Sequence, residues 1–311
     1  MAFAFLFPGQ GSQSLNMMDG FAAPIVKETF DEASEALGED LWAMLKADSA
    51  EAINQTINTQ PLMLAAGVAT YRAWLAAGGA TPTHFAGHSL GEYSALVAAD
   101  ALDFDDAVRL VRLRAEAMQS AVPAGEGAMA AVLGLDDAEI VLACAEAAAG
   151  DVVSAVNFNA PGQVVIAGSK AAVDRAIAAC KARGAKRAMP LPVSVPSHCA
   201  LMRPAADKLA EALVGISVNV PLVPVIHNAD VASYTDSAAI RDALVRQLYS
   251  PVRWTETIRL LAAQGVLHQA ECGPGKVLAG LNKRIEASVV SFALTNDAAL
   301  ETTLDTLAAL S

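Results

Sequence analysis

A serine between two glycines is the first group in this sequence that could do covalent chemistry. The stretch Gly87-His-Ser-Leu-Gly91 follows a short apolar run and precedes a helical pattern. A G-x-S-x-G sequence is typical of a sharp turn from strand to helix, which exposes the serine hydroxyl and needs glycine on both sides. The following helix directs its N-terminal amides at the same point, so the amide of Leu90 is a candidate oxyanion donor. We therefore interpret Ser89 as a nucleophile rather than as a helix cap.

A serine hydroxyl needs a nearby base, and the chain has five histidines. His88 adjoins the serine and His84 opens the preceding strand, so we expect both to be structural. The remaining three are candidates for the base: His198 lies on a proline-flanked loop, and His227 and His268 end strand-like runs. Residue pattern alone leaves all three open.

The next predicted helix contains three arginines with different surroundings. Asp105 precedes Arg109 by four residues and Glu116 follows Arg112 by four, so both arginines have a predicted partner within the helix. Arg114 has only apolar residues three and four positions away. Because an unpaired guanidinium is costly to bury, Arg114 needs a carboxylate from elsewhere in the fold or from a ligand. Together with Ser89, it predicts an enzyme for acyl groups that carry a free carboxylate.

Two glycine-containing turns follow predicted strands. Pro8-Gly-Gln-Gly-Ser-Gln13 should form a loop at the carboxyl end of the sheet, where α/β proteins place their sites and where backbone amides can face an oxyanion. Glu271-Cys-Gly-Pro-Gly-Lys276 is interpreted as a plain tight turn.

The elements that must position these residues alternate in type. Strand-like runs separated by helical patterns occur in the first and last thirds of the chain, at 3–7, 84–86, 222–227, 266–271 and 289–294. This alternation predicts an α/β fold with a mostly parallel sheet. Residues 128–190 instead read β-α-β-β-α-β, which is ferredoxin-like. We predict a discontinuous large domain over 1–124 and 196–311, with a small α+β domain inserted at 125–195.

Composition limits the function classes. The chain has 311 residues and a net charge of -12, which argues against binding nucleic acid or an anionic membrane. Arg72 interrupts the apolar run 62–80, so no membrane span is expected. The four cysteines show no metal-ligand spacing and are interpreted as reduced thiols of a cytoplasmic protein.

Taken together, several motifs strongly resemble one enzyme family. They are P-G-Q-G-S-Q, G-H-S-L-G-E, the arginine at Arg114, V-P-S-H, Q-L-Y-S-P-V-R-W and G-P-G-K, in order along nearly the whole chain. They resemble the malonyl-CoA:acyl carrier protein transacylases of type II fatty-acid synthesis and the acyltransferase domains of polyketide synthases. The fold that this resemblance implies is an α/β-hydrolase-like large domain with a ferredoxin-like insertion.

The resemblance implies a role for each matching residue. Ser89 would accept the acyl group, and His198 would be its base, oriented by the main-chain carbonyl of Gln247. Arg114 would bind the malonyl carboxylate. The backbone amides of Gln10 and Leu90 would form the oxyanion hole. Leu90 after the nucleophile and the small Ser197 before the histidine resemble malonyl-selecting members.

The implied reaction is a ping-pong transfer from malonyl-CoA to the phosphopantetheine thiol of an acyl carrier protein, without a metal or redox cofactor. We expect a monomer. Since the carrier of this family is a small acidic protein, docking needs a local basic face. The candidates are the segment 181–187 with Lys276, Lys283 and Arg284.

Two other functions compete with this one. An esterase or thioesterase would use Ser89, an acid such as Asp230, and His268. A non-catalytic module that binds acyl-CoA or the carrier would tolerate loss of Ser89. The presence of serine, base and arginine disfavours the module.

Overall fold

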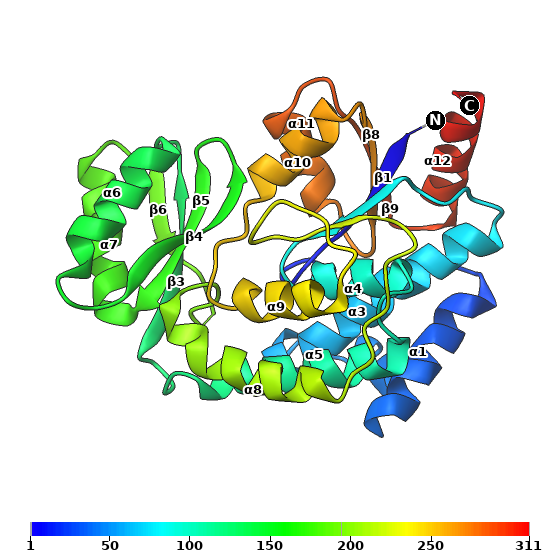
Figure 1. Cartoon of the computed structure of the whole chain (residues 1–311), viewed down its shortest axis with the longest axis horizontal. Helices are drawn as coiled ribbons and strands as arrows, with labels where there is room; N and C mark the ends of the chain where they lie inside the picture. The colour runs from blue at the N-terminus through cyan, green and yellow to red at the C-terminus, as the bar shows by residue number, and fades with distance from the viewer. Residues whose placement is uncertain (1, 194, 311) are drawn as a thin grey trace.

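The computed structural model describes residues 2–193 and 195–310, arranged as two sheets with surrounding helices (Figure 1). Met1, Ser194 and Ser311, which fall within the predicted domain limits, lie outside the described residues. The larger sheet has the order β7-β2-β1-β8-β9, and every pairing in it is parallel. Its strands are β1 (Phe3–Phe7), β2 (His84–Gly87), β7 (Val225–Ile226), β8 (His268–Cys272) and β9 (Val290–Leu294). The predicted α/β class, with a parallel sheet built from both ends of the chain, is confirmed.

One predicted strand is much shorter than expected. The apolar pattern indicated a strand over 222–227, but β7 contains only two residues. Leu222 is exposed, and Pro224 has no N–H with which to continue a ladder. The apolar run therefore joins the sheet only at its end.

Helices cover both faces of the parallel sheet. Phe3, Phe5 and Phe7 of β1 pack into one core with apolar residues of the helices on that side, whereas Ala4 and Leu6 pack into a second core on the other side. This is why β1 is apolar at every position instead of alternating. The first layer comprises α1 (Pro24–Leu37), α2 (Leu41–Leu45), α3 (Thr56–Ala76), α4 (Gly91–Ala98), α5 (Phe104–Ser120), α8 (Arg203–Val214) and α9 (Ser237–Gln247). The second comprises α10 (Trp254–Ala263) and α11 (Val277–Ile285), and α12 (Asp297–Ala309) packs on β9.

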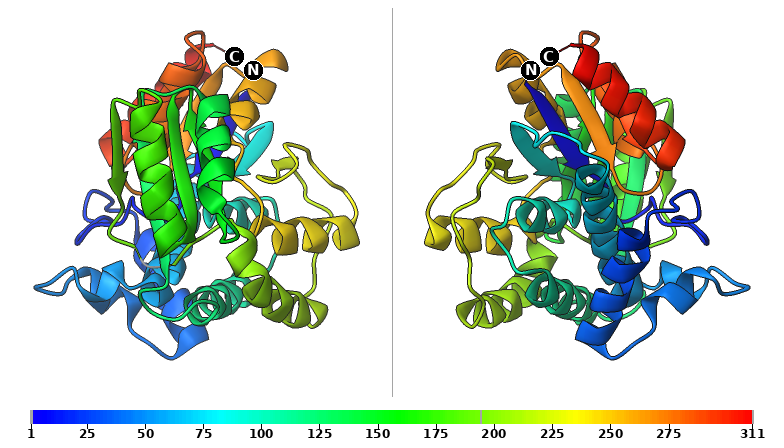
Figure 2. Two further views of the ribbon diagram at one scale, coloured as in Figure 1. Left: turned by 90° about the vertical axis from the view of Figure 1, so that its left-hand side faces the viewer. Right: turned by 90° about the vertical axis from the view of Figure 1, so that its right-hand side faces the viewer.

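The middle of the chain forms a separate antiparallel sheet with its own core (Figure 2). Its order is β4-β5-β3-β6, built from β3 (Gly127–Leu133), β4 (Val153–Ala160), β5 (Gln163–Ser169) and β6 (Arg187–Pro190). The helices α6 (Asp137–Ala148) and α7 (Lys170–Ala182) pack against it. This matches the expected β-α-β-β-α-β sequence. The exact domain limits, 125–195, stay a prediction.

Strand β4 joins the small unit to the large one. The Val252 amide donates to the Val156 carbonyl at 2.8 Å, and the Phe158 amide donates to the Val252 carbonyl at 3.0 Å. These bonds place Asn157 and Asn159 of β4 beside the carboxyl end of the parallel sheet. In the described part of the chain, no helix has the length and apolar character needed to cross a membrane.

Candidate active site

The serine turn lies where β2 passes into α4, next to the carboxyl end of β1. Ser89 has φ 51°, in the left-handed region, which costs a residue other than glycine about 1–3 kcal/mol. A Cβ at Gly87 would lie 1.9 Å from the carbonyl carbon of Gly91, so no side chain fits there. The predicted strand-turn-helix is confirmed, and the turn holds Ser89 in a strained conformation above the sheet.

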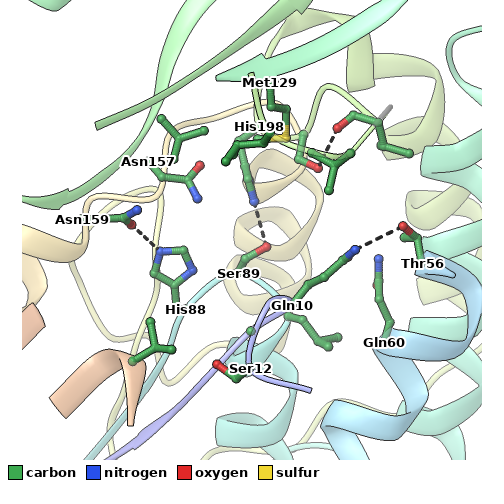
Figure 3. A pocket seen from close by; sticks show the side chains of 18 of the residues that line it. Gln10, Ser12, Thr56, Gln60, His88, Ser89, Met129, Asn157, Asn159 and His198 are labelled. Carbon is green, nitrogen blue, oxygen red and sulfur yellow. Dashed lines mark hydrogen bonds between the residues drawn. The ribbon is translucent and has the colours of Figure 1, made fainter. Parts of the chain in front are cut away.

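The structure brings His198, rather than the other candidate bases, to the serine. Ser89 Oγ lies 2.7 Å from His198 Nε2 (Figure 3). His198 Nδ1 lies 2.8 Å from the main-chain carbonyl oxygen of Gln247. A carbonyl can only accept, so Nδ1 carries the proton and Nε2 is free to accept the serine proton. A serine and an imidazole in this geometry can perform nucleophilic catalysis.

The surroundings of His198 keep its ring uncharged. Burial, together with the positive charge of Arg114, lowers the pKa of His198 to about 3. The imidazole is therefore neutral at physiological pH, which is the form that a general base requires.

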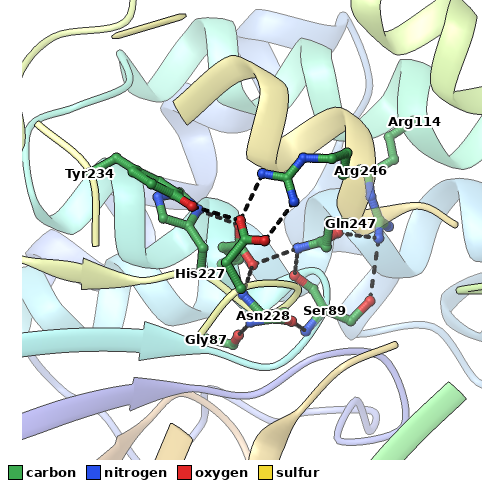
Figure 4. Close-up of polar contacts among 10 residues, drawn as sticks. Gly87, Ser89, Arg114, His227, Asn228, Tyr234, Arg246 and Gln247 are labelled. Carbon is green, nitrogen blue, oxygen red and sulfur yellow. Dashed lines mark hydrogen bonds and ion pairs between the residues drawn. The ribbon is translucent and has the colours of Figure 1, made fainter. Parts of the chain in front are cut away.

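Arg114 has neutral hydrogen-bond partners only. Arg114 is 1% exposed, and its Nη1 donates to Gln60 Oε1 at 2.8 Å. Its Nη2 donates to Gln247 Oε1 at 3.0 Å and to Ser89 Oγ at 3.3 Å (Figure 4). Among the residues that the structure describes, no carboxylate forms an ion pair with it. The guanidinium therefore lies beside the candidate nucleophile with its charge uncompensated by a direct protein partner.

The partners of the neighbouring arginines differ in part from expectation. Arg109 pairs with Asp105 as predicted, at 3.6 Å. Arg112, however, forms a bidentate ion pair with Glu39, in which both hydrogen bonds are 2.7 Å long. The prediction that Glu116 is its partner is therefore wrong. A parallel double hydrogen bond fits the planar guanidinium better than a single contact along the helix.

Two backbone amides are unpaired beside the serine. Within residues 2–193 and 195–310, neither the Leu90 amide nor the Gln10 amide donates to another protein group. Both residues line the same pocket as Ser89 and His198. An oxygen bound between them would find two free donors, as an oxyanion hole requires.

These groups open into a pocket of about 250 Å³ between the two sheets (Figure 3). One wall carries polar groups from β4 and the other comes from the start of α3 and from α11. Residues that line it include Gln10, Thr56, Asn157, Asn159, Ser197 and Val277. Amide and hydroxyl side chains therefore share this pocket with Ser89 and His198.

The side chains of His88, His227 and His268 contact groups other than the Ser89 hydroxyl. His88 also lines the pocket, and its Nε2 lies 2.8 Å from Asn159 Oδ1. His227 is fully buried with Nδ1 2.7 Å from Glu92. His268 is the first residue of β8, so its predicted place at the end of a strand is wrong. It stacks on Phe292 at the opposite end of the sheet from Ser89.

The acid and base of the esterase alternative do not meet the serine. Asp230 forms an ion pair with Arg246 and accepts a hydrogen bond from Tyr234 (Figure 4). The pairing with Arg246 holds the pKa of Asp230 below its usual range. Neither Asp230 nor His268 contacts Ser89 in the described residues, so that triad is not assembled.

Sequence reasoning missed Gln60 and Asn228. Gln60 is buried in α3 and accepts a hydrogen bond from Arg114, and Asn228 bonds the backbone of the serine turn. Asn228 carried one usable signal, since it follows a strand-like run at the carboxyl edge of the sheet, where sites occur.

The chain is similar to known proteins over nearly its whole length. The family model of the acyl transferase domain matches residues 4–291. A malonyl CoA-acyl carrier protein transacylase from Escherichia coli (strain K12) is 62% identical over 305 residues, covering 97% of this chain and 99% of that protein. The structure of the transacylase of that name from Coxiella burnetii aligns with a TM-score of 0.97 at 51% identity, covering 99% of this chain and 98% of that one. A chain in a structure of a type II PKS acyl-carrier protein in complex with its malonyl-transacylase aligns with a TM-score of 0.97 at 56% identity, covering 98% and 100%.

Proposed function

The chain belongs to the acyl transferase domain family, and from this premise we propose that it transfers a malonyl group from malonyl-CoA to the phosphopantetheine thiol of an acyl carrier protein. The observation that carries the proposal is the buried Arg114, without a carboxylate partner in the described residues, 3.3 Å from a serine hydroxyl that is itself 2.7 Å from a neutral imidazole. An acyl group with a free carboxylate can pair that carboxylate with Arg114 while its carbonyl carbon faces the Ser89 hydroxyl.

In the first half-reaction the serine takes the acyl group. His198 Nε2 accepts the Ser89 proton as Oγ attacks the thioester carbonyl carbon, and the Gln10 and Leu90 amides stabilise the resulting oxyanion. The C–S bond then breaks, and the imidazolium returns its proton to the leaving CoA thiolate. The Gln247 carbonyl keeps the imidazole in the required tautomer throughout.

The second half-reaction reverses these steps with another thiol. His198 accepts the proton of the carrier thiol, the sulfur attacks the malonyl-serine ester, and Ser89 regains its proton as the C–O bond breaks. The transfer requires no metal or redox cofactor. A monomeric state and a cytoplasmic location stay predictions.

The test is the intact mass of the protein after addition of malonyl-CoA. We expect a malonyl increment that disappears in Ser89→Ala and forms slower by orders of magnitude in His198→Ala. His268→Ala is the matched control and should acylate normally. A crippled His268→Ala with a near-normal His198→Ala would contradict the assignment of the base.

A further inference from the structure

The peptide backbone of Ser89 is held at both ends by side chains distant in sequence. Asn228 Oδ1 accepts a hydrogen bond from the Ser89 amide at 2.6 Å, and Gln247 Nε2 donates one to the Ser89 carbonyl oxygen at 3.0 Å (Figure 4). These two contacts fix the backbone from which the hydroxyl projects.

Asn228 bridges the turn itself. Besides accepting from the Ser89 amide, it donates through Nδ2 to the Gly87 carbonyl oxygen at 2.6 Å. One amide side chain thus bonds both peptide groups on either side of His88. An aspartate lacks the donor and a leucine lacks both groups, so the pairing needs an amide.

Asn228 is itself anchored on the helix that follows the turn. It is 1% exposed, and its backbone amide donates to Glu92 Oε2 at 2.9 Å. The same carboxylate oxygen accepts from Gln247 Nε2 at 2.9 Å, and the other carboxylate oxygen of Glu92 lies 2.7 Å from His227 Nδ1. The bridge therefore rests on a buried hydrogen-bond network centred on Glu92 of α4.

We infer that Asn228 is a positioning residue for the transfer reaction, acting through the Ser89 backbone. Its bridge holds Ser89 at φ 51°, with the hydroxyl toward His198. It also occupies the Ser89 amide, which leaves the Leu90 amide to face the developing oxyanion. The inference rests on the proposed role of Ser89 as nucleophile.

The test is Asn228→Leu, which keeps the size of the side chain and removes both bonds. We expect the rate constant for malonyl-serine formation to fall about 10- to 100-fold, because a small misplacement of a reacting group slows a reaction by that much. Rapid quenching and intact-mass measurement give this rate constant. The malonyl-CoA concentration for half-maximal rate and the ratio of malonyl to acetyl loading should not change, because Arg114 is untouched.

Asn282→Leu is the matched control. Asn282 is equally buried and also uses both amide groups, accepting from Trp254 and donating to Gln269, in the core of the opposite layer. Asn282→Leu should lower the melting temperature by about as much as Asn228→Leu does. Its acylation rate constant should stay near that of the parent protein.

Asn228→Ser, whose side chain is too short to span both peptide groups, serves if the leucine variant does not fold. A parental rate constant in either folded Asn228 variant, or an equal loss in Asn282→Leu, overturns the inference. Failure of the parent protein itself to form an acyl-serine would instead refute the proposed function.

Discussion

At the scale of single residues, Arg114 differs from the other arginines of α5 in what surrounds its guanidinium. Arg109 and Arg112 each pair with a carboxylate, whereas Arg114 bonds two glutamines and a serine. Those neutral partners fix the direction of the guanidinium without neutralising its charge. Arg114 is therefore prepared to receive an anion.

Arg114→Ala should lower malonyl loading of Ser89 by about 10- to 100-fold, because a charged hydrogen-bonded pair contributes about 1.5–3 kcal/mol. Loading of the neutral acetyl group should change less, so the ratio of malonyl to acetyl loading falls. Arg112→Ala is the control on the same helix and should leave the ratio unchanged. An unchanged ratio in Arg114→Ala would place selectivity elsewhere.

The neutral state of His198 predicts the response of the reaction to pH. Because burial lowers its pKa to about 3, the imidazole stays unprotonated as pH falls from about 8 to about 5. The rate constant for acyl-serine formation should be flat over that interval, and the protonation that abolishes base function should begin only near pH 3. Rapid-quench acylation at a series of pH values checks this. An inflection near the ordinary histidine pKa of about 6.5 would contradict it.

At the scale of elements, the site depends on how closely α4 approaches β1. A Cβ at Gly91, the first residue of α4, would lie 2.0 Å from the Phe7 carbonyl oxygen at the end of β1. Only glycine lets the helix start there, with the serine turn directly above the sheet. The strand and helix therefore meet backbone to backbone.

Gly91→Ala should destabilise the protein by about 1–3 kcal/mol or more, since the strand backbone must shift to admit the methyl group. Gly280→Ala in α11 is the matched control, because a Cβ there meets nothing within 4 Å. It should stabilise by about 0.5–1 kcal/mol through helix propensity. Urea denaturation of both variants measures the two effects, and equal stability changes would refute the steric argument.

At the scale of the whole molecule, the negative net charge disfavours binding of an acidic carrier protein, whereas a local basic face would favour it. A chain of net charge -12 repels an acidic carrier at long range, so association depends on local basic residues. Of the predicted basic segments, 181–187 has Arg183 committed to Glu139 and Glu146. Helix α11 carries Lys283 and Arg284 in its last turn, and other residues of the same helix line the pocket. These two basic residues are therefore the better candidates for the docking face.

Reversing both charges, Lys283→Glu with Arg284→Glu, should raise the KM for the carrier protein several-fold and weaken its salt dependence, because rim charges act mainly on association. Acylation by malonyl-CoA should be preserved. Lys27→Glu on α1, which contributes nothing to the pocket lining, is the control. A KM for the carrier that stays at the parental value would remove α11 from the docking face.

Local sequence pattern is enough to predict those parts of the fold and site that depend on neighbouring residues. Short apolar runs and glycine spacing predicted β1, β2 and the serine turn, because a turn of that kind is set by the few residues within it. The same local pattern singled out Arg114, whose own helix offers no acidic neighbour. The family resemblance then named His198 and Gln247, which local pattern could not.

Contacts between residues far apart in the chain could be learned only from the folded structure. His198 lies 109 residues from Ser89 and Asn228 lies 139 residues from it, so no local pattern relates them. The same reason explains the wrong partner for Arg112, whose carboxylate comes from Glu39, 73 residues away. The choice among His198, His227 and His268 depended on which of the three lies beside the carboxyl end of β2 once the chain is folded. That return is set by packing of the two layers and the inserted sheet, a property of the whole core and not of any segment.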